Sequence, residues 1–261
     1  MRCARCTGRI RKRVLRKTLR SSTSSTTPSL SPATKIDLKL GTLHRQLEER
    51  GYALVHNAVA RAVLDNVESK VDCQHAGQRN LLSVTAIREL ASSKLIHELV
   101  DPVLGPNTFA VRSILFNKQP GANWKVVWHQ DCVVAVRQKR TVSGWGPWSV
   151  KEGVHHVRPP AELLARMVSL RIHLDDCGAL NGPLRVLPGS HRHKILSDEQ
   201  RLRWPKENAV TCVADRGDAI LMRPLLLHAS SAAAVPTNRR VIHIEFAAED
   251  LPDGMEWYER I

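Results

Sequence analysis

Residues 167–175 read MVSLRIHLD, and their alternation of apolar and polar side chains decides the fold class. Successive side chains of a strand point to opposite faces of a sheet, so a period of two residues indicates a β-strand. One face carries the apolar side chains Leu170, Ile172 and Leu174. The other face carries four polar side chains: Ser169, Arg171, His173 and Asp175. A polar face is usually solvated, but in a two-sheet β fold it can line an internal site.

Short strands separated by turn residues surround this segment. We expect them at 108–118, 126–136, 183–187, 210–213, 218–223 and 239–247. Many short strands at such spacing are typical of a β-sandwich or barrel, and double-sheet jelly rolls, which include the cupins, are one such architecture. The sequence therefore predicts a mainly β domain with flanking helices.

The flanking helices precede the strands. Residues 37–105 have a mainly helical pattern, with helices around 43–51, 63–71 and 85–104 and a short strand at 52–55. Gly51 and the pair Gly105-Pro106 are natural helix stops. The segment 138–160 is rich in Gly, Trp and Pro, which predicts a long loop of the kind that covers binding sites, followed by a short helix after Pro160.

The basic charge of the chain is concentrated at its start. The 261 residues carry a formal net charge of +14, but residues 1–35 contain ten Lys or Arg and no acidic residue. The remaining 226 residues are close to charge balance, so the folded domain lacks the general basic footprint of a nucleic-acid-binding protein. We therefore divide the chain into a basic, Ser/Thr-rich tail at 1–36 and a domain at 37–261.

The composition of residues 1–36 favours disorder, and it is also that of an organellar transit peptide or of an upstream extension without function. The six cysteines are too scattered for a disulfide framework, which favours a reducing compartment such as the cytoplasm, or an organelle if the tail is a transit peptide. The lone Cys3-Ala4-Arg5-Cys6 lacks the second ligand pair of a zinc finger. The absence of an 18-residue apolar run predicts no membrane span.

Deletion of residues 1–36 is expected to leave the thermal unfolding temperature and metal binding of the domain nearly unchanged. The tail has too little apolar area to offset the entropy lost on ordering. Differential scanning calorimetry of both forms tests this, and a large loss of stability or metal binding would show that the tail packs on the domain.

A candidate metal site follows from two histidines and an aspartate. His129 and Asp131 are two residues apart, so they point the same way on an extended strand, and His228 can complete one face of an octahedral metal. This 2-His-1-carboxylate set is typical of non-haem Fe(II) oxygenases. A second pair, His173 and Asp175, has the same spacing and could also reach His228, so spacing alone leaves both pairs open.

Four ordered motifs resemble the phytanoyl-CoA dioxygenase family over roughly residues 40–250. They are FNKQPG at 116–121 followed by WHQD at 128–131, NGPLRVLPGSH at 181–191, GDAILM at 217–222 with His228-Ala229-Ser230, and Arg239. The resemblance implies a double-stranded β-helix, Fe(II), 2-oxoglutarate as co-substrate and dioxygen. It also implies hydroxylation of a small molecule with release of succinate and CO2.

The resemblance assigns roles to individual residues. His129, Asp131 and His228 would bind iron and form the catalytic centre, whereas His173 and Asp175 would lie on a downstream strand and line the cavity. By their chemistry, further residues are expected to contact 2-oxoglutarate: Arg239, whose bidentate guanidinium suits a carboxylate, and Ser230, Gln130 and Lys118. Arg171 is expected at the metal-side carboxylate or at the substrate, and a structural salt bridge is the alternative for it. Arg240 would point to the opposite face.

Two other functions remain open at this point. One is a cupin-like metalloenzyme that does not use 2-oxoglutarate, which would have no need of the Arg239 clamp. The other is a non-catalytic small-molecule-binding protein on the same fold, which would be free to lose a metal ligand. Neither the substrate, CoA thioester or otherwise, nor the oligomeric state follows from the sequence.

Overall fold

The computed structural model describes residues 32–72 and 75–261, with the side chains of the first segment described from Gly41 onward. Residues 1–31, which include most of the tail and its C-x-x-C pair, lie outside the described residues. Helix α1 spans Pro32–Arg50 and so begins within the segment 1–36. A cut after residue 31 therefore tests the separable tail without shortening α1.

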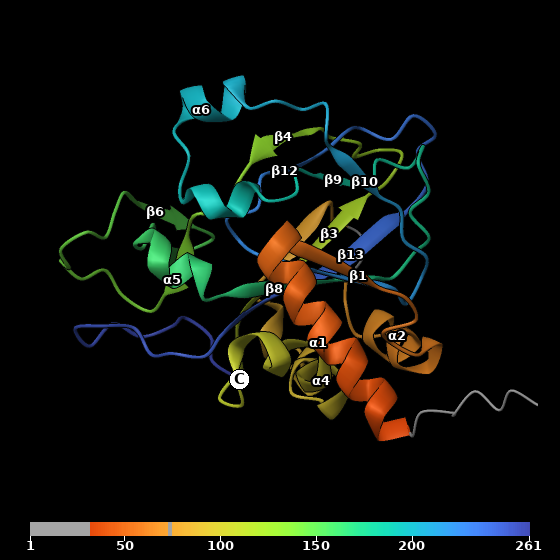
Figure 1. The fold of residues 1–261 in the computed structure, drawn as a ribbon, viewed down its shortest axis with the longest axis horizontal. Helices are drawn as coiled ribbons and strands as arrows, with labels where there is room; N and C mark the ends of the chain where they lie inside the picture. The colour runs from red at the N-terminus through yellow and green to blue at the C-terminus, as the bar shows by residue number, and fades with distance from the viewer. Residues whose placement is uncertain (1–31, 73–74) are drawn as a thin grey trace, which may run out of the picture.

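Helices form the first part of the domain (Figure 1). They are α1, α2 (Arg61–Glu68), a 3-10 turn at Leu81–Ser83, α3 (Thr85–Ala91) and α4 (Lys94–Leu104). The single helix expected at 85–104 is divided because Ser93 caps a new helix, with its side chain accepting a hydrogen bond from the Ile96 amide. Helix α4 ends at Gly105, as expected.

The strands form three antiparallel sheets. The six-stranded sheet has the order β1 (Tyr52–Val55), β11 (Ala219–Met222), β8 (Val168–His173), β13 (Arg239–Ala247), β3 (Phe109–Lys118), β2 (Gly77–Arg79). The four-stranded sheet is β10 (Val210–Cys212), β9 (Leu184–Val186), β12 (His228–Ser230), β4 (Val126–His129). The third sheet is β5 (Val134–Val136), β7 (Val154–Val157), β6 (Trp148–Lys151).

The layers of the molecule are helices, six-stranded sheet and four-stranded sheet. Helices α1, α2 and α4 cover one face of the six-stranded sheet, and the four-stranded sheet lies on its other side (Figure 1). Leu43, Leu47 and Ile96 of the helices share one apolar cluster with Leu170 of β8 and Ile242 of β13. Burial of this cluster holds the outer face of the sheet, which leaves its inner face free to form a site.

Strand β8 has the two faces that its sequence predicts. Leu170 and Ile172 belong to the cluster beneath the helices, while Ser169, Arg171 and His173 are buried on the opposite side of the strand. The strand ends at His173, so Asp175 does not continue the alternation. The predicted jelly-roll class is confirmed.

The segment 138–160 is not the long loop that we expected. Its second half forms the hairpin β6–β7, in which Lys151 pairs with Val154 across a two-residue turn. Glu152 and Gly153 both have positive φ, 51° and 78°, which is the requirement of a type I′ turn. Glu-Gly is a weak sequence signal for this turn compared with Asn-Gly, so the hairpin was missed.

Two short helices lie near the sheets: α5 (Ala161–Ala165), as expected after Pro160, and α6 (Asp198–Arg203). Residues 190–193 form a further 3-10 turn. No helix in the described ranges has the length and apolarity needed to cross a membrane.

Candidate metal centre

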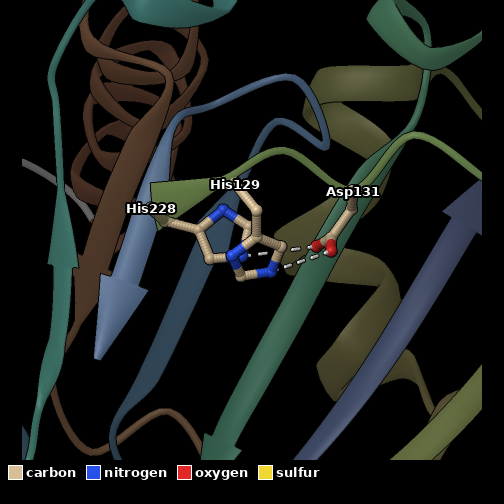
Figure 2. Close-up of side chains that lie close together, drawn as sticks. All are labelled: His129, Asp131 and His228. Atoms are coloured by element: carbon tan, nitrogen blue, oxygen red, sulfur yellow. Dashed lines mark ion pairs between the residues drawn. The ribbon is translucent and has the colours of Figure 1, made fainter. Parts of the chain in front are cut away.

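Three side chains converge at one point (Figure 2). Two of them come from paired strands, and the third comes from the loop after one of these strands. His129 ends β4 and His228 begins β12, and the two are direct cross-strand partners. The chain then leaves β4, so the expected continuous strand 126–136 is broken, and the Asp131 amide donates to the Pro224 carbonyl at 2.9 Å. This bend places the Asp131 carboxylate opposite both imidazoles.

The hydrogen bonds of the two imidazoles direct the same ring nitrogen toward Asp131. His129 Nδ1 lies 2.9 Å from the Val127 carbonyl oxygen, and His228 Nδ1 lies 2.8 Å from that of Leu226. A carbonyl only accepts, so each Nδ1 carries the proton and each Nε2 keeps its lone pair. Each Nε2 lies 3.7 Å from an oxygen of Asp131, and all three ligand atoms lie within 4.8 Å of one another.

This spacing suits a metal ion. Nitrogen and oxygen ligands at about 2.1 Å from a metal, on adjacent octahedral positions, lie about 3 Å apart. Burial lowers the pKa of His228 to about 3, so its ring is neutral, as a metal ligand must be. Burial alone would raise the pKa of Asp131, but the facing His228 and His129 lower it below its ordinary value, so the carboxylate is ionised.

The second H-x-D pair does not join this cluster. Within residues 32–72 and 75–261, the only His, Cys, Asp and Glu group with metal-ligand spacing is His129, Asp131 and His228. The Asp175 carboxylate instead binds the Arg240 guanidinium at 2.6 Å, and His173 is buried elsewhere on β8. The expectation that His173 and Asp175 line the cavity is therefore wrong, because neither is part of its wall.

A cavity of about 450 Å³ opens beside the three side chains, between the six-stranded and four-stranded sheets. Its apolar wall comes from Ile114 and Phe116 of β3, Trp124, and Leu184 of β9. The wall also carries many charged side chains, and two charged groups lie at different places in the wall or directly behind it.

The first charged group consists of Lys118, Arg171 and Arg239, which are all buried. Arg239 and Lys118 are cross-strand partners on β13 and β3, and burial lowers the pKa of all three side chains, with repulsion from Arg239 adding to the lowering in Lys118 and Arg171. Burial is the main cause and lowers the pKa of Lys118 to about 8 and that of Arg171 to about 10. Burying a cation is unfavourable unless an anion is near, so this group favours an anionic ligand.

The hydrogen bonds of this group leave room for such a ligand. Lys118 Nζ donates to Ser230 Oγ at 2.9 Å and to the Ser231 carbonyl at 2.6 Å, and Arg239 donates to the Gly182 carbonyl. Among the described residues none of the three cations has a carboxylate partner within salt-bridge distance. Nε of Arg171 and Nε of Arg239 are buried without any hydrogen-bond acceptor.

Gly182 brings the chain close to this group. Its φ is +60°, and a Cβ there would lie 2.6 Å from the Ser231 carbonyl oxygen, so only glycine fits the turn. Ser231 and Gly182 thus both present carbonyls to the cations, which holds Lys118 and Arg239 in place.

Gln130 has a different position from the one we expected. Its amide nitrogen donates to the carbonyls of Lys194 and Leu225, and its oxygen accepts from the Leu196 amide, all at 2.7–2.8 Å. Both donors are therefore occupied by the protein. The side chain holds the bend between His129 and Asp131 rather than offering a donor to a ligand.

The second charged group was missed in the sequence. It contains Arg112 and Glu245, which form an ion pair at 3.0 Å, His243, Lys151 and Arg79. In the sequence, Arg112, His243 and Glu245 are polar residues that alternate with apolar ones in the segments that form β3 and β13. Lys151 could not be placed without the β6–β7 hairpin.

Comparison with protein families gives one match: residues 42–241 match the family described as phytanoyl-CoA dioxygenase. This range contains His129, Asp131, His228 and Arg239, and it covers most of the chain. Comparison with curated proteins found no match.

Solved structures with the same fold include several non-haem enzymes. The apo form of a non-heme monooxygenase, ThoJ, is 18% identical with a TM-score of 0.60, covering 78% of this chain and 76% of that one. The non-heme alpha-ketoglutarate-dependent epimerase SnoN from nogalamycin biosynthesis is 14% identical with a TM-score of 0.59, covering 84% and 91%. HygX from Streptomyces hygroscopicus, with nickel and 2-oxoglutarate bound, is 12% identical with a TM-score of 0.56, covering 84% and 87%.

Proposed function

The chain belongs to the phytanoyl-CoA dioxygenase family, and from this premise we propose that His129, Asp131 and His228 hold Fe(II) in a 2-oxoglutarate-dependent oxygenase. The reaction proposed is hydroxylation of a small molecule. One oxygen atom of O2 enters a C–H bond of the substrate, and the other enters succinate as 2-oxoglutarate loses CO2.

The donor set fits the metal. Two imidazoles and one carboxylate would hold the metal on one face of an octahedron and leave the other positions open, which is the arrangement of non-haem Fe(II) oxygenases. When bound, the iron supplies the oxygen activation that no protein side chain can provide. The protein side chains fix the ligand geometry and exclude water with the apolar wall of the cavity.

The observation that carries the proposal is the group of buried cations beside the metal site. 2-Oxoglutarate has two carboxylates, and the one far from the metal is expected to bind Arg239 and Ser230 of the cavity wall, with Lys118, which donates to Ser230, as a further donor. Arg171 lines the same cavity and is expected to contact the metal-side carboxylate or the substrate. A cupin-like enzyme without 2-oxoglutarate would leave these three cations unneutralised.

Anaerobic titration with Fe(II) and 2-oxoglutarate is expected to produce a weak visible charge-transfer band, because the bound 2-oxo acid chelates the metal. The band should require both components, and a His228→Ala variant is the matched control. Iron binding without any band on addition of 2-oxoglutarate would favour the cupin-like alternative. Failure to bind iron would favour the non-catalytic one.

A further inference from the structure

The cavity holds more positive charge than iron and 2-oxoglutarate require. Seven Lys and Arg side chains form its wall against two carboxylates, those of Asp131 and Glu245. The charges of Fe(II) and 2-oxoglutarate offset each other, so binding them leaves this excess unchanged. Carboxylates outside the wall meet part of this excess, and the rest must be met by another anion or remain as an unfavourable repulsion.

Most of the cations can be assigned a partner. Arg239 and Arg171 belong to the buried group beside Ser230, which the co-substrate fits. Arg201 is paired with Asp198, and Arg79 with Glu152. Two cations of the wall have no side-chain hydrogen-bond or ion-pair partner among the described residues. One is Arg158, whose Nε is buried without an acceptor, and the other is Lys151 of the second charged group.

Arg112 is held beside Lys151 by a chain of buried hydrogen bonds. Arg171 contacts His243 Nδ1 at 3.2 Å, His243 Nε2 contacts Glu245 at 3.4 Å, and the same Glu245 oxygen accepts from Arg112 at 3.0 Å. The guanidinium of Arg171 only donates, so the His243 proton is on Nε2 and points to Glu245. Arg112 is thereby positioned with the rest of its guanidinium facing the cavity.

Three elements bring this group together. Arg112 lies on β3, Lys151 on β6 and Arg79 on β2, and the Arg79–Glu152 ion pair joins the edge of the six-stranded sheet to the β6–β7 turn. Burial, followed by repulsion from Arg112 and Arg79, lowers the pKa of Lys151.

We propose that the prime substrate is an anionic small molecule, and that Lys151 and Arg112 bind its carboxylate or phosphate group in the cavity beside the metal site. The assignment of this anion as the substrate rests on the proposed function. The anion site itself depends only on the residues of the second charged group.

Inorganic phosphate is a suitable probe for this site. In isothermal titration calorimetry of the metal-free protein at constant ionic strength, Lys151→Met is expected to weaken phosphate binding by roughly ten- to a hundredfold, because a charge-assisted hydrogen bond is lost. Lys151→Arg should restore most of the affinity. Met retains the length of the side chain, and Lys151 has no partner to lose, so the variant should fold.

Lys139→Met is the matched control. Lys139 lies in the same 138–160 segment, is exposed and is not part of the cavity wall. Phosphate affinity should be unchanged in this variant. Equal weakening by both substitutions, unchanged binding in Lys151→Met, or no phosphate binding by the wild type would each overturn the proposal.

A second experiment separates this site from the co-substrate site. In the anaerobic complex with Fe(II) and 2-oxoglutarate, phosphate should show 31P line broadening from the paramagnetic iron while the charge-transfer band persists. Lys151→Met should lose the broadening, and loss of the band on addition of phosphate would contradict a separate site. If no band forms at all, the proposed function fails, and calorimetry still decides the anion site.

The source of the anion can be distinguished with two further probes. Methyl phosphate and acetate are compared in the same complex, and stronger Lys151-dependent binding of one identifies a phosphorylated or a carboxylic substrate. If neither shows Lys151-dependent binding while phosphate does, the site holds an adventitious ion only and the substrate assignment is overturned.

Discussion

Replacement of His228 by alanine is expected to abolish iron binding and 2-oxoglutarate-dependent turnover while the fold survives. The ring is buried and its Nε2 faces Asp131, so alanine removes one of three ligands without removing a packing element of the apolar clusters. His129→Ala and Asp131→Ala should have the same effect. Metal content by atomic emission measures iron binding, succinate formation from 2-oxoglutarate measures turnover, and thermal unfolding measures the fold.

His173→Ala is the control for this series. His173 is buried on β8 with the same residue spacing to an aspartate, but it lies outside the metal cluster and the cavity wall. The His173→Ala variant should therefore retain iron. A His173→Ala variant that loses the metal, together with a His129→Ala variant that keeps it, would show that the ligand assignment is mistaken.

The long, regular strands could be predicted because local patterns determine them. Strand β13 has the predicted bounds 239–247, β1 has the predicted bounds 52–55, and β8 has the predicted alternation. In β8 and β13 a period of two residues is imposed by one face that packs on an apolar layer. This periodicity is a local property of the segment, so it can be recognised without knowing the contacts made by the rest of the chain.

The irregular parts could not be predicted because contacts distant in sequence determine them. The bend between β4 and β5 depends on Gln130, whose partners lie near residues 194–196 and 225. Asp131 is oriented by that bend and by the Pro224 carbonyl, so its convergence with His228 does not follow from spacing. The resemblance to a family, rather than periodicity, selected His129 over His173.

The second charged group illustrates the same limit at the level of function. Arg112 and Glu245 are 133 residues apart, yet they form one buried ion pair across β3 and β13. Lys151 joins them only because the Glu152-Gly153 turn folds β6 back on β7. A site assembled from strands of two sheets has no contiguous motif, so only the structure could reveal it.

Arg239→Ala is expected to weaken 2-oxoglutarate binding by roughly 30-fold to several-thousand-fold, because removing the partner of a buried charge costs about 2–5 kcal/mol. The guanidinium is buried, and its Nε lacks an acceptor in the free protein, so it is available to the carboxylate. Titration of the charge-transfer band gives the 2-oxoglutarate affinity. Iron affinity measured without 2-oxoglutarate should change much less, because Arg239 is not a metal ligand.

Arg240→Ala is the matched control, because the neighbouring residue on a strand points to the opposite face. Its guanidinium binds Asp175 and Glu68 away from the cavity, so 2-oxoglutarate affinity should be nearly unchanged. Arg239→Lys should recover only part of the affinity, since an ammonium cannot make the bidentate contact of a guanidinium. Lys118 and Arg171 still supply positive charge in these variants, so a large loss in Arg239→Ala would identify directional hydrogen bonding, not charge alone, as the basis of binding. Equal losses in Arg239→Ala and Arg240→Ala would instead show that the far carboxylate binds elsewhere.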